Sequence, residues 1–192
     1  MDRALILYLH GFCSSPASWK SRLLGDEMAR RGLGADFHCP ALSPVPDEAI
    51  AQASRVIENA QQENRPVTLV GSSLGGHYAT VLAEKYGLHA AVINPAVVSQ
   101  LDLGMFVGEH ANFHTGERFI FTAEHAAQLL AQVVRPSPER YWLLQEEGDE
   151  VLDWRQARDF YAGCRQTILP NGDHSFTQFP RYIAQLIEFT GL

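Results

Sequence analysis

The segment Val67–Gly76 reads VTLVGSSLGG and contains a serine with glycines two residues before and two residues after it. Between a strand and a helix, Gly-x-Ser-x-Gly lifts the serine hydroxyl out on a sharp turn, and small residues let strand and helix approach each other. Gly71 and Gly75 place Ser73, rather than Ser72, in this register. A glycine-rich turn in a Rossmann-like sheet is the alternative interpretation, so further residues must decide.

A histidine that could serve as the base for this serine lies near the carboxyl end of the chain. His174 follows the last predicted strand and precedes the last predicted helix, so its loop can carry the imidazole back toward Ser73. A nucleophilic serine needs such a base to remove its proton. A surface histidine in a turn is the ordinary alternative, but the position and the order along the chain favour a base.

Two aspartates are candidates for the acid that would orient the histidine and stabilise the imidazolium. Asp149 follows Gly148 in a loop after the predicted strand 141–144, and we assign it as the acid. Asp153 is the rival, although it also stands where it could cap a helix that begins near Trp154. Glutamates of the same stretch are expected to lie in solvent, namely Glu146, Glu147 and Glu150.

Two backbone N–H groups are candidates for stabilising a tetrahedral oxyanion. The first is that of Leu74, which follows the candidate nucleophile at a helix N-terminus. The second is that of Phe12, at the end of the first predicted strand. Gly11 would let the backbone approach a bound substrate, and His10 beside it would border that substrate with a side chain whose main role is structural.

Short apolar runs alternate with longer amphipathic segments along most of the chain. This alternation predicts a mainly parallel sheet with helices on both faces, the α/β class. The predicted strands are 4–9, 36–39, 67–70, 90–93, 141–144 and 164–169, and the predicted helices are 19–31, 46–61, 74–86, 123–133, 154–161 and 179–189.

The stretch from about residue 95 to residue 140 breaks this rhythm. It contains the predicted helix 123–133 but no convincing strand. We interpret it as an insertion that covers the top of the sheet within a single domain, residues 1–192. A plain crossover helix with long loops is an equally good interpretation.

Seven motifs occur together along the chain, namely LYLHGF at 7–12, GSSLGG at 71–76, VINPA at 92–96, TG at 115–116, WLLQ at 142–145, GDEVLD at 148–153 and HSFT at 174–177. With these motifs the sequence resembles the YqiA-type bacterial esterases, which are compact α/β-hydrolases. The resemblance covers nearly the whole chain and departs from the family pattern mainly in residues 104–119 and at Ser175. It implies hydrolysis of carboxylic esters or of acyl thioesters such as acyl-CoA, with Ser73, Asp149 and His174 as the catalytic residues.

Two other classes of function remain open from the sequence. An acyltransferase would use the same serine but a different acceptor from water. A binding or scaffolding protein with a hydrolase fold would have little turnover, and it is disfavoured because serine, acid and histidine occur in the expected order.

Composition narrows the remaining possibilities. A formal net charge of −7 argues against a basic face for nucleic acid or an anionic membrane. Three scattered cysteines and the lack of a signal-peptide pattern around residues 4–9 favour a cytoplasmic protein with reduced thiols. His110 and His114 are four residues apart, but Ala111 stands where a helical zinc motif needs glutamate. We therefore expect neither a metal nor another cofactor, and a small acyl ester or thioester as the partner.

Overall fold

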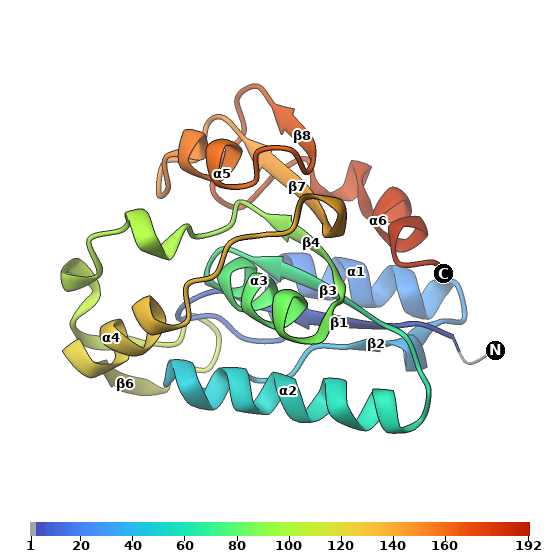
Figure 1. Cartoon of the computed structure of the whole chain (residues 1–192), viewed down its shortest axis with the longest axis horizontal. Helices are drawn as coiled ribbons and strands as arrows, with labels where there is room; N and C mark the ends of the chain where they lie inside the picture. The colour runs from blue at the N-terminus through green and yellow to red at the C-terminus, as the bar shows by residue number, and fades with distance from the viewer. Residues whose placement is uncertain (1–2) are drawn as a thin grey trace.

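The computed structural model describes residues 3–192, and its centre is a six-stranded sheet in which every neighbouring pair is parallel (Figure 1). The strand order is β2-β1-β3-β4-β7-β8. This arrangement is the predicted α/β class. The strands are β1 (Leu5–Leu9), β2 (Phe37–His38), β3 (Val67–Ser72), β4 (His89–Ile93), β7 (Tyr141–Glu146) and β8 (Arg165–Leu169).

Helices cover both faces of the sheet because alternate residues of the central strands are apolar on each side. In β1, Leu5, Leu7 and Leu9 belong to the core under α2, α3, α4 and α5, whereas Ile6 and Tyr8 belong to the core under α1 and α6. The helices are α1 (Trp19–Arg30), α2 (Pro46–Gln62), α3 (Leu74–Tyr86), α4 (Ala123–Ala131), α5 (Trp154–Phe160) and α6 (Ile183–Phe189).

Successive strands are added on opposite sides of β1: β2 pairs with one edge of β1 and β3 with the other. This change of side positions the candidate site. The chain leaves β1 toward α1 on one face and leaves β3 toward α3 on the other. A crevice at the carboxyl ends of two such strands is the usual ligand site of an open parallel sheet. Gly11 and Phe12 follow β1 and Ser73 follows β3, so the candidate residues meet there.

Residues 95–140, which we call the cover segment, differ from the prediction in one respect. We expected a helix but no strand in this segment, and the second part of that expectation is wrong. β5 (Gly108–Ala111) and β6 (Arg118–Phe121) form an antiparallel hairpin. Each strand has four residues and only one face in contact with the protein, so its sequence pattern is weak. The hairpin packs on the ring of Phe12, whose centroid lies 5.3 Å from that of Phe121.

The last predicted helix, 179–189, is also different in the structure. A 3₁₀ turn spans Phe179–Arg181, and α6 begins only at Ile183. Pro180 lies inside the turn, where its missing N–H suits the start of a helix better than the interior. None of the helices in residues 3–192 is long and apolar enough to cross a membrane.

Candidate active site

Ser73 lies on the turn that joins β3 to α3, and its backbone is strained. Its φ of 56° and ψ of −123° are uncommon for a residue other than glycine. A Cβ on Gly71 would overlap the carbonyl oxygen of Gly75, and a Cβ on Gly75 would overlap that of Leu9. The Ser73 amide donates a 3.0 Å hydrogen bond to the Ile93 carbonyl. The two glycines therefore allow a turn that puts Ser73 at its tip.

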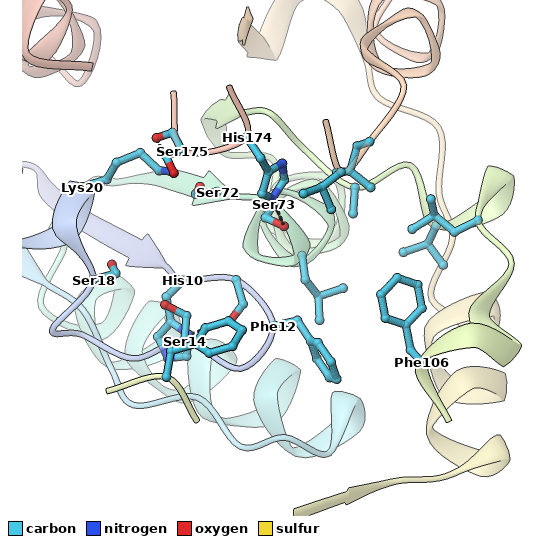
Figure 2. Close-up of a pocket in the computed structure, with 18 of the residues that line it drawn as sticks. His10, Phe12, Ser14, Ser18, Lys20, Ser72, Ser73, Phe106, His174 and Ser175 are labelled. Carbon is cyan, nitrogen blue, oxygen red and sulfur yellow. Dashed lines mark hydrogen bonds between the residues drawn. The ribbon is translucent and has the colours of Figure 1, made fainter. Parts of the chain in front are cut away.

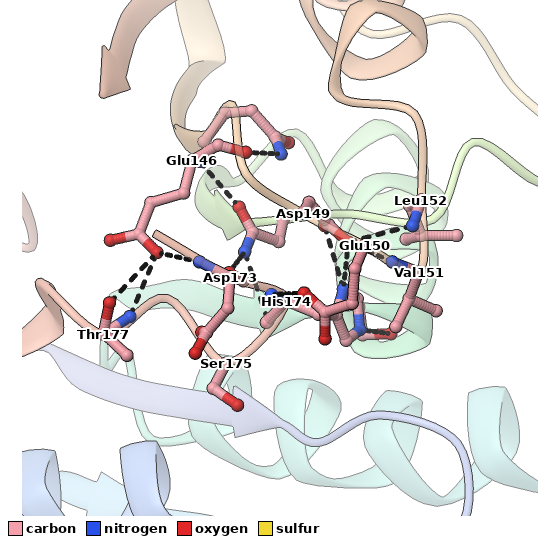
Figure 3. Close-up of polar contacts among 12 residues, drawn as sticks. Glu146, Asp149, Glu150, Val151, Leu152, Asp173, His174, Ser175 and Thr177 are labelled. Carbon is pink, nitrogen blue, oxygen red and sulfur yellow. Dashed lines mark hydrogen bonds and ion pairs between the residues drawn. The ribbon is translucent and has the colours of Figure 1, made fainter. Parts of the chain in front are cut away.

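His174 connects Ser73 to Asp149 through both nitrogens of its ring (Figures 2 and 3). Its Nε2 lies 3.0 Å from Ser73 Oγ, and its Nδ1 lies 2.9 Å from each carboxylate oxygen of Asp149. The Asp149 side chain is fully buried, and its Oδ1 accepts hydrogen bonds from the backbone amides of Val151 and Leu152. An ionised carboxylate can only accept, so Nδ1 carries the hydrogen and Nε2 is free to accept a proton from Ser73.

Asp153, the rival candidate for the acid, has a different contact set. Its Oδ1 accepts a 3.1 Å hydrogen bond from the Arg155 amide and lies 3.2 Å from the Arg155 guanidinium. It is the residue before α5, where an aspartate satisfies a free N–H of the first turn. The structure thus brings Asp149, and not Asp153, to His174.

Phe12 and Leu74, whose N–H groups are the candidate oxyanion donors, both line the cavity at Ser73. Neither the Phe12 nor the Leu74 N–H has a hydrogen-bond acceptor within residues 3–192. A Cβ on Gly11 would lie 3.1 Å from the Cβ of Ser73, so glycine keeps this approach open. The N–H of Leu74 also belongs to the first turn of α3, where the helix dipole favours negative charge.

His10 is buried, and both of its ring nitrogens are engaged by the backbone. Its Nε2 accepts a 3.1 Å hydrogen bond from the Leu42 amide, so Nδ1 is the nitrogen that donates to the Gly11 carbonyl at 3.0 Å. Burial lowers the pKa of His10, which keeps the ring neutral. His10 borders the cavity together with Gly11, and its hydrogen bonds tie the loop after β1 to the segment after β2.

The expectation that Glu146 lies in solvent is wrong. Strand β7 continues through Glu146, whose side chain is completely buried. Its carboxylate accepts hydrogen bonds from the amides of Asp173 and Thr177 at 2.9 and 3.1 Å (Figure 3). It also accepts a 3.0 Å hydrogen bond from the Gln178 amide. These donors compensate for burying the charge. Glu146 therefore holds the loop that carries His174.

Asn94 and Glu150 support the same loop. The side-chain NH₂ of Asn94 donates hydrogen bonds to the backbone carbonyls of Asp173 and His174 at 3.0 and 3.1 Å. The side-chain oxygen of Asn94 accepts a hydrogen bond from the backbone N–H of Glu146. Glu150 is exposed, as expected, but its carboxylate accepts a 2.9 Å hydrogen bond from the His174 amide. Glu147 is exposed as expected. We did not predict a role for Asn94, and its place in the VINPA motif at 92–96 is the only sequence signal for it.

A cavity of about 470 Å³ opens at Ser73 and is mostly apolar. The cover segment supplies much of its wall. Phe12 and Phe106 meet edge to face, with ring centroids 6.0 Å apart. Trp19 also lines the cavity. Phe176, two residues after His174, does not, because its ring is fully buried in the core. The apolar lining includes Phe12, Leu101, Leu103, Phe106, Phe121 and Leu129.

The described residues contain no group of three or more side chains that could hold a metal ion. His110 lies on β5 rather than on a helix, and its Nε2 is 2.7 Å from the Phe106 carbonyl oxygen. His114 lies beyond the end of this strand and is exposed. The four-residue spacing of the two histidines therefore does not put them on one helix face.

With this geometry in place, comparison with known proteins identifies the family. The Uncharacterised protein family UPF0227, the YqiA family, matches residues 5–191. The chain belongs to this family. The biotin biosynthesis bifunctional protein BioHC of Teredinibacter turnerae is 29% identical to it over 195 residues. That alignment covers 88% of this chain and 32% of BioHC, so this member of the YqiA family spans about a third of the length of its curated relative.

Solved structures that resemble this YqiA-family protein have the α/β-hydrolase fold. A putative hydrolase from Agrobacterium vitis superposes with a TM-score of 0.74 at 20% identity, over 98% of this chain and 88% of that one. Est1E from Butyrivibrio proteoclasticus gives 0.68 at 12% identity, over 98% and 86%. At these identities the similarity establishes the fold and not the activity.

Proposed function

We propose that this protein is a serine hydrolase that cleaves carboxylic esters or acyl thioesters. The observation that carries the proposal is the hydrogen-bonded chain from Asp149 through His174 to Ser73 on the strained turn. Nucleophile, base and orienting acid are then all within hydrogen-bond distance of their partners. No step of this chemistry requires a cofactor.

The reaction begins when the Ser73 hydroxyl attacks the acyl carbonyl and His174 Nε2 takes its proton. The tetrahedral oxyanion accepts hydrogen bonds from the N–H groups of Phe12 and Leu74. His174 then returns the proton to the departing alcohol or thiol, which leaves an acyl group on Ser73. In the second half, His174 takes a proton from water as the water attacks the acyl-enzyme, and the acid is released when the proton goes back to Ser73 Oγ.

The apolar cavity supports an acyl substrate rather than a sugar or a peptide backbone. Its wall offers Phe106, Phe121 and Leu129 to a hydrocarbon chain, and burying each methylene there stabilises the complex by about 0.8 kcal/mol. The names of the structural neighbours are consistent with this proposal. They include Est1E with ferulic acid bound and an S-formylglutathione hydrolase from Agrobacterium tumefaciens.

The test combines covalent labelling with turnover. A fluorophosphonate should add one adduct to the wild-type protein, detected by intact mass, and none to Ser73→Ala. 4-Nitrophenyl butyrate and the butyryl thioester of coenzyme A should both be tried as substrates. Hydrolysis of either, lost in Ser73→Ala, supports the proposal, and absence of both labelling and turnover contradicts it.

A transferase is the second candidate, because the acyl-enzyme could react with an alcohol or amine instead of water. Adding methanol or hydroxylamine to the assay separates the two. If product forms only in the presence of such an acceptor, the protein is an acyltransferase. If neither labelling nor turnover occurs, the binding-protein alternative is favoured.

A further inference from the structure

The cavity lining differs chemically on the two sides of Ser73 (Figure 2). Phe106 of the cover segment lies on one side of Ser73, which we call the apolar branch. Ser18 and Lys20 lie on the other side, at the beginning of α1. Nothing in the hydrolytic steps uses this second, polar branch.

The start of α1 is unusual for a helix of twelve residues. Ser18 precedes it, yet its hydroxyl does not cap the helix. Ser18 Oγ is buried and has no hydrogen-bond partner within residues 3–192. The first turn contains no acidic residue. In the described part of the chain the N–H groups of Trp19, Lys20 and Ser21 also have no acceptor. A buried, unpartnered hydroxyl beside free N–H groups and a positive helix end is suited to an anion.

Lys20 adds a full positive charge to this branch. Its Nζ donates a 2.8 Å hydrogen bond to the carbonyl of Ser175, which leaves further N–H donors. No carboxylate of residues 3–192 lies within 4.0 Å of it. Burial lowers the pKa of Lys20 to about 8, so the amine is largely protonated at neutral pH.

Three carboxylates face Lys20 from farther away, and two of them are already engaged. Asp149 contacts His174, and Glu146 accepts the amides of the His174 loop. The third, Asp173, has one buried oxygen without a partner in the described residues. The amine thus has acidic surroundings that keep it charged but no direct ion-pair partner.

We propose that Ser18, Lys20 and the first turn of α1 bind an anionic group, a carboxylate or a phosphoryl group, on the leaving group of the substrate. This inference rests on the proposed ester or thioester hydrolysis. With the acyl chain in the apolar branch and the carbonyl carbon at Ser73, the leaving group points toward α1. The substrate is then an apolar acyl group joined to an anionic alcohol or thiol.

The experiment compares three phenyl butyrates that differ only at the para position. They carry a carboxylate, its neutral methyl ester, or a phosphate. The quantity of interest is the ratio of kcat/KM for each anionic ester to that for the neutral ester. In one protein this ratio measures recognition of the charge. Between proteins, differences in the chemical reactivity of the esters cancel.

In the wild type the ratio should exceed that of Lys20→Gln by about tenfold, as expected for a charge-assisted hydrogen bond. Lys20→Arg keeps the charge and should retain most of the preference. Ser18→Ala should lower the ratio by about fivefold, because it removes one hydrogen bond to the anion from an uncharged donor. High salt should reduce the wild-type ratio and leave that of Lys20→Gln nearly constant. If the carboxylate and phosphate esters respond alike, the site recognises charge; if only one responds, that group is the ligand.

Lys85→Gln is the matched control. It changes the net charge by the same amount, but Lys85 lies in the last turn of α3, at the opposite end of that helix from Ser73. Its ratio should equal that of the wild type. If Lys85→Gln lowers the ratio as much as Lys20→Gln does, the preference for the anionic ester comes from the overall charge of the protein and not from this branch.

Three outcomes would overturn the inference. One is a ratio that is the same in the wild type, Lys20→Gln and Ser18→Ala. The second is that Lys20→Gln selectively loses activity on a 4-nitrophenyl ester with a carboxylate on its acyl chain, which would put the anion on the acyl side. The third is failure to hydrolyse any of the esters together with no fluorophosphonate labelling, in which case the proposed function itself is wrong.

Discussion

The turn that carries Ser73 and the loop that carries His174 are held in place by different forces. The Ser73 turn depends on backbone packing: Gly71, Gly75 and Gly76 each lie where a Cβ would collide with neighbouring atoms. The His174 loop depends on side-chain hydrogen bonds, which come chiefly from Glu146 and Asn94. The Ser73 turn therefore requires residues without side chains, whereas the His174 loop requires particular polar side chains.

This difference determines how each side should respond to substitution. A glycine at the turn cannot be replaced without moving the surrounding elements, because a new Cβ would meet backbone atoms, the Ala79 methyl group or the carbons of Pro95. A polar group under the His174 loop can be replaced while the fold remains, at the cost of a less well-placed imidazole. Substitutions on the two sides should therefore separate loss of chemistry from loss of positioning.

The largest effect is expected at the tip of the turn. Ser73→Ala removes the nucleophile and should lower kcat by on the order of a millionfold if the three residues work as a unit. Ser72→Ala is the matched control one residue away, and it should keep most of the activity. Steady-state rates on 4-nitrophenyl butyrate measure both. Equal losses in the two variants would mean that the turn geometry, and not one hydroxyl, is what the substitutions disturb.

The next effect separates the two aspartates that follow β7. Asp149→Asn cannot hold the same tautomer of His174 or stabilise its imidazolium, so kcat should fall by up to about ten-thousandfold with little change in Tm. Asp153→Asn should keep most activity, because asparagine caps a helix about as well as aspartate. Asp153→Ala should lose about 1 kcal/mol of stability. Loss of activity in Asp153→Asn with retention in Asp149→Asn would exchange the two roles.

A smaller effect is expected from the support of the His174 loop. Glu146→Ala leaves the amides of Asp173, Thr177 and Gln178 without their acceptor, so the loop should loosen and kcat should fall by about a hundredfold. Glu146→Gln keeps one acceptor oxygen and should recover part of that loss. KM should change little, because Glu146 does not line the cavity. If kcat in Glu146→Ala equals that of the wild type, the carboxylate does not position the base.

The last expected effect is on the free energy of unfolding rather than on kcat, and it concerns α3, the helix that follows Ser73. Burial in α3 lowers the pKa of His77 to about 4, whereas an unfolded histidine titrates near 6.5. The unfolded state therefore binds more protons between these values, and the free energy of unfolding should fall as pH decreases from about 6.5 to about 4. His77 accounts for up to about 3 kcal/mol of that loss.

Urea unfolding of the wild type and of His77→Gln at pH 7.5 and at pH 4.5 measures this contribution. The variant, which has no proton to bind, should lose less stability between the two conditions. A loss as large as that of the wild type would mean that other groups account for the acid sensitivity.

The same contrast explains what the sequence could and could not reveal. The Ser73 turn was predictable because its requirements, two glycines between a strand and a helix, are adjacent in the chain. The positions of His174 and Asp149 followed from the order of loops after parallel strands. Glu146 was placed wrongly because its partners are 27 to 32 residues away in sequence. No local pattern shows that those amides will surround it.

The cover segment was also only partly predictable. Its helix α4 was expected, whereas β5 and β6 were not. These strands pack against Phe12, a residue about a hundred positions earlier, and their outward residues, such as Ile120, are exposed. Packing of that kind depends on tertiary contacts and leaves little periodicity in the sequence.

The measurement that tests the central claim most directly is peptide mapping of the fluorophosphonate adduct. Wild-type protein and the Ser72→Ala variant should both carry the label on Ser73, and Ser73→Ala should carry none. Prior mutation of His174 to alanine should slow labelling strongly, because the hydroxyl then has no base. Label on Ser72, or labelling of Ser73 that is equally fast without His174, would contradict the assignment of Ser73 as a nucleophile activated by His174 and Asp149.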